Sequence, residues 1–454
     1  MQRELRISLT DSDQIDVAIV GGGPGGIIAL YYARQAGLRT ILLEARDTVG
    51  GLWMQLPSWQ DIQNRQEDWT LGDIPIAGVD QASIAANIRQ WVDTFDLGQY
   101  IRPKSPALTA SPINGEWDIR TPSGTIRAKA LISATGVHNR PFIPEIQRSH
   151  ADIPELHSSM LYNPDCLVGK AIIVVGGGAS AFDLIDLCLE HGAARIVWVH
   201  RSLKWMAPTR KPKRFASNVR ELAKRHMLGE TGEQISAALD ADLRARYNKF
   251  GMEELLPNAR FDIERDQLIP GRWRLIASLS MIERHHDELE AIKGRSIVLR
   301  SGIAIDADVL LWGTGYEMDI SYLQTAGLNE IVRPDQLARR CGSMVVSLDA
   351  PNLYFISVGL ESTSATPWHY AHLARTIVSQ ISGTAALSRD PVLKHLNYFG
   401  VPTFLASFDP ASYPANGWRD EYLSLVTEFP NDRPLPIPDY KGLEFKLYPA
   451  VERL

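Results

Sequence analysis

Two glycine-rich loops, each lying between a predicted strand and a predicted helix, constrain this fold most. The first is Gly21-Gly22-Gly23-Pro24-Gly25-Gly26, and the second is Gly176-Gly177-Gly178-Ala179-Ser180-Ala181. In such a βαβ unit the first glycine allows a tight turn, the second lets the backbone approach a pyrophosphate, and the third position lets helix and strand pack closely. The helix N-terminus directs its N–H groups at the phosphates. The pair predicts an α/β fold with two Rossmann-like dinucleotide-binding domains, and two cofactors with electron transfer between them.

An acidic residue completes the first unit. The apolar run 14–20 ends directly at the first loop, and a predicted helix over Ile27–Gly37 leads to a second strand over Thr40–Leu43. Glu44 follows that strand, 18 residues after Gly26, where a carboxylate can accept hydrogen bonds from ribose hydroxyls. The predicted cofactor-binding residues of this unit are Gly21, Gly23, Pro24, Gly25, Gly26, Glu44 and Ala45.

The second unit lacks that acid. A predicted helix over Ser180–His191 leads to a strand over Ile196–Val199, which is followed by His200-Arg201-Ser202. An arginine here matches a ribose 2′-phosphate, whereas a carboxylate would match a free 2′-hydroxyl. The unit therefore predicts NADPH rather than NADH, with a solvated basic loop as the alternative interpretation of Arg201. The predicted cofactor-binding residues are Gly176, Gly178, Ala179, Ser180, Ala181, His200, Arg201 and Ser202.

Charge and cysteine content exclude several classes of protein. The 454 residues include 47 basic and 53 acidic ones, for a net charge of −6, which argues against nucleic acid or an anionic membrane as the main partner. No apolar run reaches about 18 residues, so no membrane span is expected. The cysteines Cys166, Cys188 and Cys341 form no C-x-x-C pair. This counts against a dithiol–disulfide reductase and predicts a cytoplasmic location. No metal site is predicted.

Three further segments resemble a known family. Gly50-Gly51-Leu52-Trp53 follows Glu44, Ala134-Thr135-Gly136 ends an apolar strand, and Trp312-Gly313-Thr314-Gly315-Tyr316 follows a later strand. These segments resemble the class B flavin-dependent monooxygenase superfamily, which includes flavin-containing and Baeyer–Villiger monooxygenases. The resemblance implies that FAD occupies the first unit, with NADPH in the second. It adds the predicted cofactor contacts Gly51, Leu52, Trp53, Thr135, Gly136, Thr314, Gly315 and Tyr316.

The resemblance also implies a reaction. NADPH would reduce FAD, reduced FAD would capture O₂ as a C4a-(hydro)peroxyflavin, and one oxygen atom would pass to a small organic substrate. N- or S-oxygenation or hydroxylation is favoured over a Baeyer–Villiger reaction. The family carries a polar residue beside the flavin after GG-x-W, which makes Asn64 and Gln63 the candidate catalytic residues; a solvent-exposed loop is the alternative interpretation. The predicted partners are the substrate and O₂, and a homodimer is an open option.

The region around His157 departs from the family pattern. The motif F-x-G-x-x-x-H aligns only with residues 151–158, where Ala151 replaces the aromatic residue and Ile153 replaces the glycine. His157 and Ser158 match, so both a functional and a structural role for His157 remain open. The departure also keeps an alternative function: an NADPH-dependent flavoprotein reductase or oxidase that does not oxygenate a substrate.

The two units and their flanks predict a discontinuous domain organisation. An FAD-binding domain is expected over residues 1–165 and again over 303–390, with the NADPH-binding domain, 166–302, inserted between these parts. A helical insertion is expected within it at about 205–293, with helices over Phe215–Leu228 and Thr231–Phe250. This insertion lines a substrate pocket or is a plain helical subdomain. A late helix is expected over Trp368–Ile381, and residues 391–454 are expected to form an irregular C-terminal arm.

Overall fold

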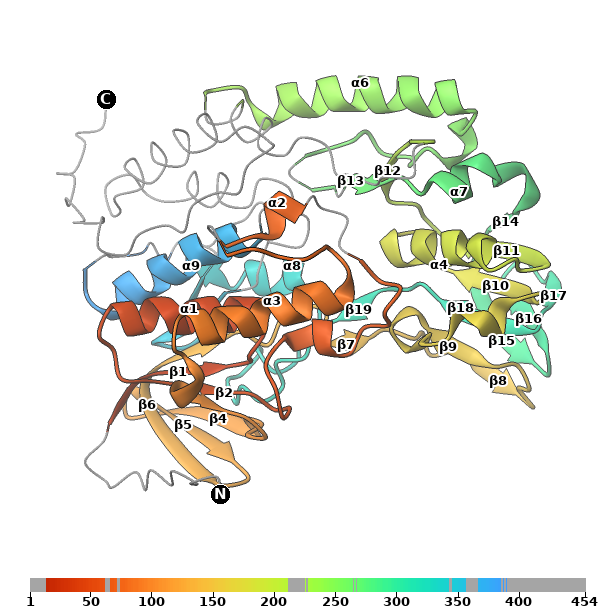
Figure 1. The fold of residues 1–454 in the computed structure, drawn as a ribbon. Helices are drawn as coiled ribbons and strands as arrows, with labels where there is room; N and C mark the ends of the chain where they lie inside the picture. The colour runs from red at the N-terminus through yellow and green to blue at the C-terminus, as the bar shows by residue number, and fades with distance from the viewer. Residues whose placement is uncertain are drawn as a thin grey trace.

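The computed structural model describes residues 14–61, 66–71, 74–210, 225, 228–263, 265–266, 268–342, 345–356, 366–384, 387 and 389. Two units, each built around a sheet with neighbouring parallel strands, lie side by side in Figure 1. The α/β class predicted from the sequence is therefore confirmed.

In the first sheet, β1 (Ile15–Val20) lies between β2 (Thr40–Leu43) and β6 (Gly124–Ser133) and is parallel to both. Val20 pairs in register with Leu43 and with Ser133, so three strands end at one level and their following loops share one edge of the sheet. The sheet order is β20 (Cys341–Gly342), β21 (Val346–Ser347), β22 (Leu353–Phe355), β6, β1, β2 and β3 (Ile101–Arg102).

An antiparallel meander extends this sheet at β6. The strands β4 (Thr109–Ile113) and β5 (Glu116–Thr121) pair with each other, and β5 pairs with β6. Their connection is Asn114-Gly115, with φ angles of 54° and 85°, as a two-residue type I′ turn requires. The asparagine–glycine pair therefore forms the hairpin turn that this dipeptide favours.

Successive side chains of β1 point to opposite faces of the first sheet, and each face has its own hydrophobic core. Val17 and Ile19 join a cluster with α1 (Pro24–Gln35), α3 (Gln81–Thr94) and α9 (Thr366–Ile381), which cover one face in Figure 1. Ala18 and Val20 join the cluster on the opposite face. Because α1 packs against both the sheet and α9, it is buried on most sides, which explains its run of apolar residues after the glycine loop.

The second sheet is wholly parallel. Its order is β14 (Glu283–His286), β11 (Arg195–His200), β10 (Ala171–Val175), β18 (Val309–Trp312) and β9 (Glu155–His157). Val175 pairs with Val199 and with Trp312, so the loops after these strands again share one edge. One face of this second sheet is covered by α4 (Ala179–Glu190). The other face packs on a separate small sheet, whose strand order is β17 (Ala304–Asp306), β16 (Ser296–Leu299), β15 (Leu289–Lys293) and β8 (Gln147–Ser149).

The segment predicted as a helical insertion at about 205–293 is only partly helical. It contains α6 (Gly232–Phe250), whose start has a capping box formed by Thr231 and Gln234, and the short α7 (Trp273–Ala277). It also contains the parallel pair β12 (Trp205–Ala207) and β13 (Leu268–Pro270), and both β14 and β15. The sequence reasoning missed these strands because each is only three to five residues long.

Shorter elements complete the described chain. They are α2 (Gln66–Trp69), α8 (Pro334–Ala338), β7 (Arg140–Pro141), β19 (Tyr316–Glu317), η1 (Gly51–Met54), η2 (Gly98–Tyr100), η3 (Ser158–Met160), η4 (Pro164–Leu167), η5 (Glu253–Leu255) and η6 (Leu279–Met281). Most of the predicted helix Phe215–Leu228 and all of the predicted arm 391–454 lie outside the described residues. Among the helices that are described, none is both long and apolar enough to cross a membrane.

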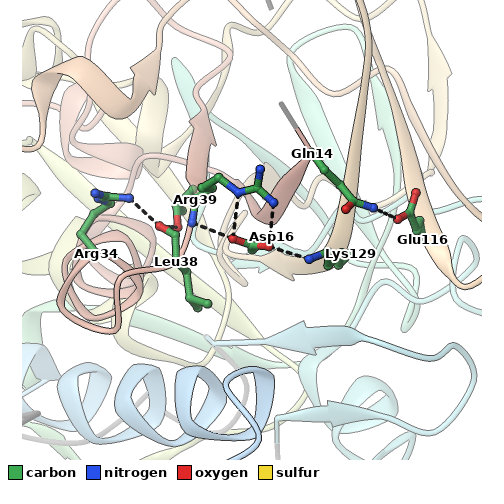
Figure 2. Close-up of polar contacts among 8 residues, drawn as sticks. Gln14, Asp16, Arg34, Leu38, Arg39, Glu116 and Lys129 are labelled. Atoms are coloured by element: carbon green, nitrogen blue, oxygen red, sulfur yellow. Dashed lines mark hydrogen bonds and ion pairs between the residues drawn. The ribbon is translucent and has the colours of Figure 1, made fainter. Parts of the chain in front are cut away.

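A partly exposed ion cluster lies at the start of β1, at the opposite end of the strand from the glycine loop. Figure 2 shows Asp16 between Arg39 and Lys129. Its carboxylate accepts hydrogen bonds from Arg39 N at 2.9 Å and from Lys129 Nζ at 2.9 Å. Burial alone would raise the pKa of Asp16, but the hydrogen bonds from Lys129 and Arg39 outweigh it and lower the pKa to about 2.

We expect Asp16→Asn to lower the free energy of unfolding at pH 7 by about 2 kcal/mol, since one pKa unit corresponds to about 1.4 kcal/mol. Because the folded pKa lies below the unfolded value of about 3.9, the stabilisation is present above about pH 4 and is lost as the pH falls toward about 2. Urea midpoints at pH 7 and pH 3 measure this, with the exposed Glu145→Gln as control. A difference from wild type that is unchanged at pH 3 would contradict the assignment.

Candidate functional site

The first glycine loop leaves no room for side chains at its two ends. Gly21 follows β1 with a φ of 110°, and a Cβ built on it would lie 2.4 Å from the carbonyl oxygen of Ala134, just after β6. A Cβ on Gly26 would lie 1.9 Å from the carbonyl oxygen of Gly21 and 3.3 Å from the Cβ of Ala134. The start of α1 therefore packs directly on the ends of β1 and β6, as a phosphate-binding turn requires.

Glu44 is tied to this loop by its own carboxylate. The side chain is buried at 3% exposure. Its Oε2 accepts a hydrogen bond from Gly22 N at 2.7 Å, and its Oε1 accepts one from Arg46 N at 2.9 Å. The predicted ribose-binding acid thus lies beside the phosphate-binding turn, while the next residue, Ala45, is exposed.

The GG-x-W segment lies against the same loop. Gly50 N donates to the carbonyl oxygen of Gly22 at 2.9 Å, and a Cβ built on Gly51 would lie 2.9 Å from Gly23 Cα. Leu52 and Trp53 follow in η1, and the ring of Trp53 meets that of Trp69 edge to face at a centroid distance of 5.7 Å. A backbone cradle of this kind, closed by an acid, fits the adenosine and pyrophosphate parts of FAD.

Two further strand ends complete the first site. Thr135 and Gly136 follow β6, and a Cβ on Gly21 would lie 3.1 Å from Thr135 N. From the far end of the chain, Tyr370 of α9 lies over the start of α1, since a Cβ on Gly25 would lie 3.4 Å from its ring. Pro24 begins α1 beside it. The sequence reasoning missed Tyr370, because nothing local in the sequence links α9 to the first loop.

The second glycine loop is packed in the same way against β18. A Cβ built on Gly176 would lie 2.2 Å from the carbonyl oxygen of Gly313. A Cβ built on Gly313 would lie 2.6 Å from Ala181 Cα and 2.9 Å from Ala181 Cβ. Alanine is accommodated at the third position of this loop because the residue facing it, Gly313, has no side chain. In the first loop the arrangement is reversed, with Gly26 facing Ala134.

The chain that follows β11 passes directly over the second loop. A Cβ built on Gly177 would lie 1.8 Å from the carbonyl oxygen of Ser202, and Lys204 N donates to the carbonyl oxygen of Gly177 at 2.8 Å. The stem of Lys204 lies 3.7 Å from the Cβ position of Gly178, at the start of α4. Lys204 is exposed, and it brings a positive charge to the phosphate-binding turn, formed with Ala179 and Ser180.

His200 and Arg201 have different environments although they are neighbours. The ring of His200 is buried, lies 4.9 Å from the Trp198 ring and stacks on His286 at 5.4 Å between centroids. Burial lowers the pKa of His200 to about 4, and His286 acts in the same direction, so the ring is neutral at pH 7. Arg201 is 74% exposed and forms an ion pair with Glu288 at 3.5 Å.

His157, at the end of β9, is hydrogen-bonded to the segment that follows β18. Its Nε2 lies 2.9 Å from the carbonyl oxygen of Gly315, and its Nδ1 accepts from Ser159 N at 3.2 Å. Because a carbonyl oxygen only accepts, Nε2 carries the proton and the ring is the neutral Nε2–H tautomer. The ring is fully buried and meets Tyr316 edge to face at 5.1 Å. His157 therefore has a structural role that joins β9 to the segment after β18.

Thr314 and Gly315 are hydrogen-bonded to Phe142, in the segment after β7. Thr314 Oγ1 donates to the carbonyl oxygen of Phe142, and Phe142 N donates to that of Gly315 at 2.9 Å. Tyr316 also lies 5.6 Å from the ring of His138, after the A-T-G segment. The predicted catalytic candidates, Gln63 and Asn64, lie outside the described residues.

The three cysteines are all free. Cys166 is exposed, whereas Cys188 and Cys341 are buried, and burial raises the pKa of both buried thiols. A low-pKa thiolate is the reactive form in dithiol–disulfide exchange. Neither buried thiol has that character, and the two lie in different elements of the fold, Cys188 in α4 and Cys341 in β20.

Two glycine turns, each following a strand with parallel neighbours in its own sheet, define an oxidoreductase that binds two dinucleotides. Residues 18–244, half of the chain, match the family model described as pyridine nucleotide-disulphide oxidoreductase. The chain therefore belongs to the pyridine nucleotide-disulphide oxidoreductase family.

Curated relatives and solved structures refine this result. The chain is 24% identical to a Baeyer–Villiger monooxygenase of Streptomyces coelicolor, over 67% of this chain and 65% of that relative. It is 25% identical to a ferredoxin–NADP reductase of Granulibacter bethesdensis, over 71% and 90% respectively. A steroid monooxygenase bound to NADP shares the fold, with a TM-score of 0.63, 18% identity, and coverage of 82% of this chain and 86% of that structure. The predicted resemblance to flavin monooxygenases, and the oxidoreductase class, are confirmed.

Proposed function

We propose that this chain is an FAD- and NADPH-dependent monooxygenase that uses O₂ to oxygenate a small organic substrate. The observation that carries the proposal is the pair of glycine turns, the first packed against the end of β6 and the second against the end of β18. A flavin chemistry needs both a reductant site and a flavin site, and two such turns supply them.

The first turn holds FAD in this proposal. Gly21, Gly23 and Gly26 form the cradle for its pyrophosphate, and the buried carboxylate of Glu44 accepts from its ribose. The second turn, from Gly176 to Ala181, holds NADPH in the same manner. When bound, NADPH supplies a hydride and FAD supplies the redox chemistry with O₂. The protein's part is to bind, to orient the two cofactors, and to exclude water from the reacting atoms.

The domain organisation forms part of the proposal. An FAD-binding domain over 1–165 and 303–390 contains an inserted NADPH-binding domain over 166–302. An inserted second domain is supported by β22, which returns to pair with β6 of the first sheet after the second sheet has been built. The strand pairing differs from the predicted bounds, because β9 (Glu155–His157) and β18 (Val309–Trp312) belong to the second sheet although they lie outside 166–302. The catalytic roles of Asn64 and Gln63, the homodimer and the cytoplasmic location stay predictions.

A second candidate function is an NADPH-dependent flavoprotein reductase or oxidase that passes electrons elsewhere. The ferredoxin–NADP reductase relative favours it, because the match covers 90% of that protein. The dithiol version of this function is disfavoured by the cysteines, two of which are buried with raised pKa values.

We expect substrate to couple NADPH oxidation to oxygen transfer. The purified flavoprotein is mixed with NADPH and ¹⁸O₂, and soft amines, sulfides and ketones are screened as substrates. One ¹⁸O atom should appear per molecule of product, and hydrogen peroxide should fall as product rises. An N- or S-oxide separates the favoured chemistry from an ester, which marks a Baeyer–Villiger reaction.

Peroxide equal to the NADPH consumed for every substrate would instead establish an oxidase. Rapid reduction of ferredoxin with no oxygenated product would establish a reductase. Either result would remove the monooxygenase proposal and leave the two nucleotide sites in place.

A further inference from the structure

An acid absent from the end of β11 is supplied by the neighbouring strand. The sequence after β11 is His200-Arg201-Ser202, which predicts NADPH because no carboxylate follows the strand. In the fold, β14 pairs parallel with β11, with His200 opposite His286. Asp287 and Glu288 therefore emerge beside Arg201, although they lie more than 80 residues later in the chain.

The Glu288 carboxylate bridges two arginines at this edge. Its Oε1 lies 3.5 Å from Arg201 Nη1, and its Oε2 lies 2.6 Å from Arg300 Nη1. The two arginines are 74% and 69% exposed, and Glu288 is 34% exposed. One anion held between two exposed guanidinium groups is the arrangement that a phosphate monoester takes with arginines.

The main chain fixes the positions of these three residues independently of their side chains. Asp287 N donates to the carbonyl oxygen of His200 at 3.0 Å, and Arg300 N donates to that of Glu288 at 2.8 Å. His286 Nε2 lies 3.0 Å from the carbonyl oxygen of Arg201, to which it donates. The three backbones are therefore anchored, and the exposed side chains can exchange partners at low cost.

The other charges at this edge do not replace Glu288. The Asp287 carboxylate accepts hydrogen bonds from Glu288 N at 2.7 Å and from Ser301 N at 3.3 Å, so it caps the main chain. Lys204 lies at the phosphate-binding turn itself, beside Gly178. His200 is neutral at pH 7. Glu288 is thus the acid that would contact the 2′-hydroxyl or 2′-phosphate of a ribose bound next to Arg201.

We infer that Glu288 is a specificity-determining residue that sets the choice between NADPH and NADH, with Arg300 as the second cation of the 2′-phosphate site. The inference rests on the proposed function, since it assumes a nicotinamide nucleotide at the second turn. A 2′-phosphate displaces the Glu288 carboxylate from both arginines and is repelled by it. A 2′-hydroxyl instead donates a hydrogen bond to that carboxylate. Glu288 therefore weakens the selectivity for NADPH and permits the use of NADH.

Two nucleotides that differ only at the 2′ position test this. Dissociation constants for adenosine 2′,5′-bisphosphate and adenosine 5′-monophosphate are measured by calorimetry on the flavin-containing protein. In Glu288→Gln we expect about tenfold tighter binding of the bisphosphate and little change for the monophosphate, as removal of one like charge near a phosphate implies. In Arg300→Ala and Arg201→Ala we expect about tenfold weaker binding of the bisphosphate alone.

The matched control is Glu283→Gln, which removes the same charge from the first residue of the same strand, where Glu283 pairs with Arg195. It should leave the ratio of the two constants unchanged. The ratio is insensitive to general damage because both ligands share the adenosine and the 5′-phosphate. Glu288→Ser gives a second test if Glu288→Gln lowers the thermal midpoint.

The outcomes separate the inference from the function on which it rests. A ratio in Glu288→Gln within twofold of wild type overturns the role of Glu288 and leaves the nucleotide site intact. Wild-type protein that binds neither nucleotide overturns both the site at the second turn and the inference. With NADPH and NADH themselves, the preference for NADPH in flavin reduction should rise about tenfold in Glu288→Gln.

Discussion

Gly26→Ala is expected to yield protein that retains about a tenth or less of the wild-type FAD. Overpacking at this position costs about 3 kcal/mol, which corresponds to more than a hundredfold loss in the equilibrium constant for FAD binding. The added methyl group would lie 1.9 Å from the carbonyl oxygen of Gly21 and 3.3 Å from Ala134 Cβ. Both atoms are fixed in position, since Gly21 directly follows β1 and Ala134 directly follows β6. Relief requires α1 to move away from the sheet, and α1 is itself buried against α9. Flavin absorbance of the purified protein and its thermal midpoint measure the effect.

Two other glycine substitutions sharpen this test. Gly98→Ala should be neutral, because a Cβ there meets no atom within 4 Å. Gly23→Ala should leave the flavin-free fold unchanged, since its Cβ would meet only Gly51 Cα at 3.7 Å. It should still lose FAD, because the methyl group occupies the space predicted for the pyrophosphate. Full flavin content in both Gly23→Ala and Gly26→Ala would remove FAD from the first turn.

Gly177→Ala is expected to slow anaerobic reduction of the flavin by NADPH about a hundredfold, or about 2.7 kcal/mol, while the flavin stays bound. The added methyl group would lie 1.8 Å from the carbonyl oxygen of Ser202 and 3.4 Å from Leu203 Cα. Residues 202–204 must then move away from the second turn, which breaks the hydrogen bond from Lys204 N to Gly177. The turn and the basic residues after β11 then no longer lie side by side, and both are needed to bind the nucleotide.

Stopped-flow absorbance at a fixed, subsaturating NADPH concentration measures that rate. Reduction by dithionite serves as the control, because it needs no nucleotide site, and its rate should match wild type. A wild-type rate with NADPH in Gly177→Ala would show that the reductant binds elsewhere. Loss of flavin together with the rate would indicate general misfolding, which the thermal midpoint would reveal.

Local sequence patterns were sufficient to predict the strand–turn–helix units. The turns at Gly21 and Gly176, the acid Glu44 and the Asn114-Gly115 hairpin each depend on residues close together in the chain. Their chemistry is local, because tight turns, helix starts and type I′ hairpins all select particular residues at fixed offsets. The α/β class follows from these units, and it was predicted correctly.

Contacts between distant segments could not be predicted in the same way. Glu288 reaches Arg201 only because β14 pairs with β11, and Tyr370 reaches Gly25 only because α9 packs on α1. The structural role of His157 depends on Gly315, 158 residues away. The strands within 205–293 are too short to show an alternating pattern, whereas α6 shows clear helical spacing. The sequence therefore led to a prediction of more helix within residues 205–293 than the structure contains there.

The alanine at position 181 bears on how such nucleotide turns are recognised. In the first unit a glycine on the helix faces an alanine after the strand, Gly26 and Ala134, and in the second unit the two are exchanged, Ala181 and Gly313. The conserved quantity is thus the combined volume of two facing residues, one methyl group in total, rather than the identity of either one. A search that demands glycine at the third position would pass over the second unit of this chain. A search over the pair of positions, some 130 residues apart in this unit, would find both.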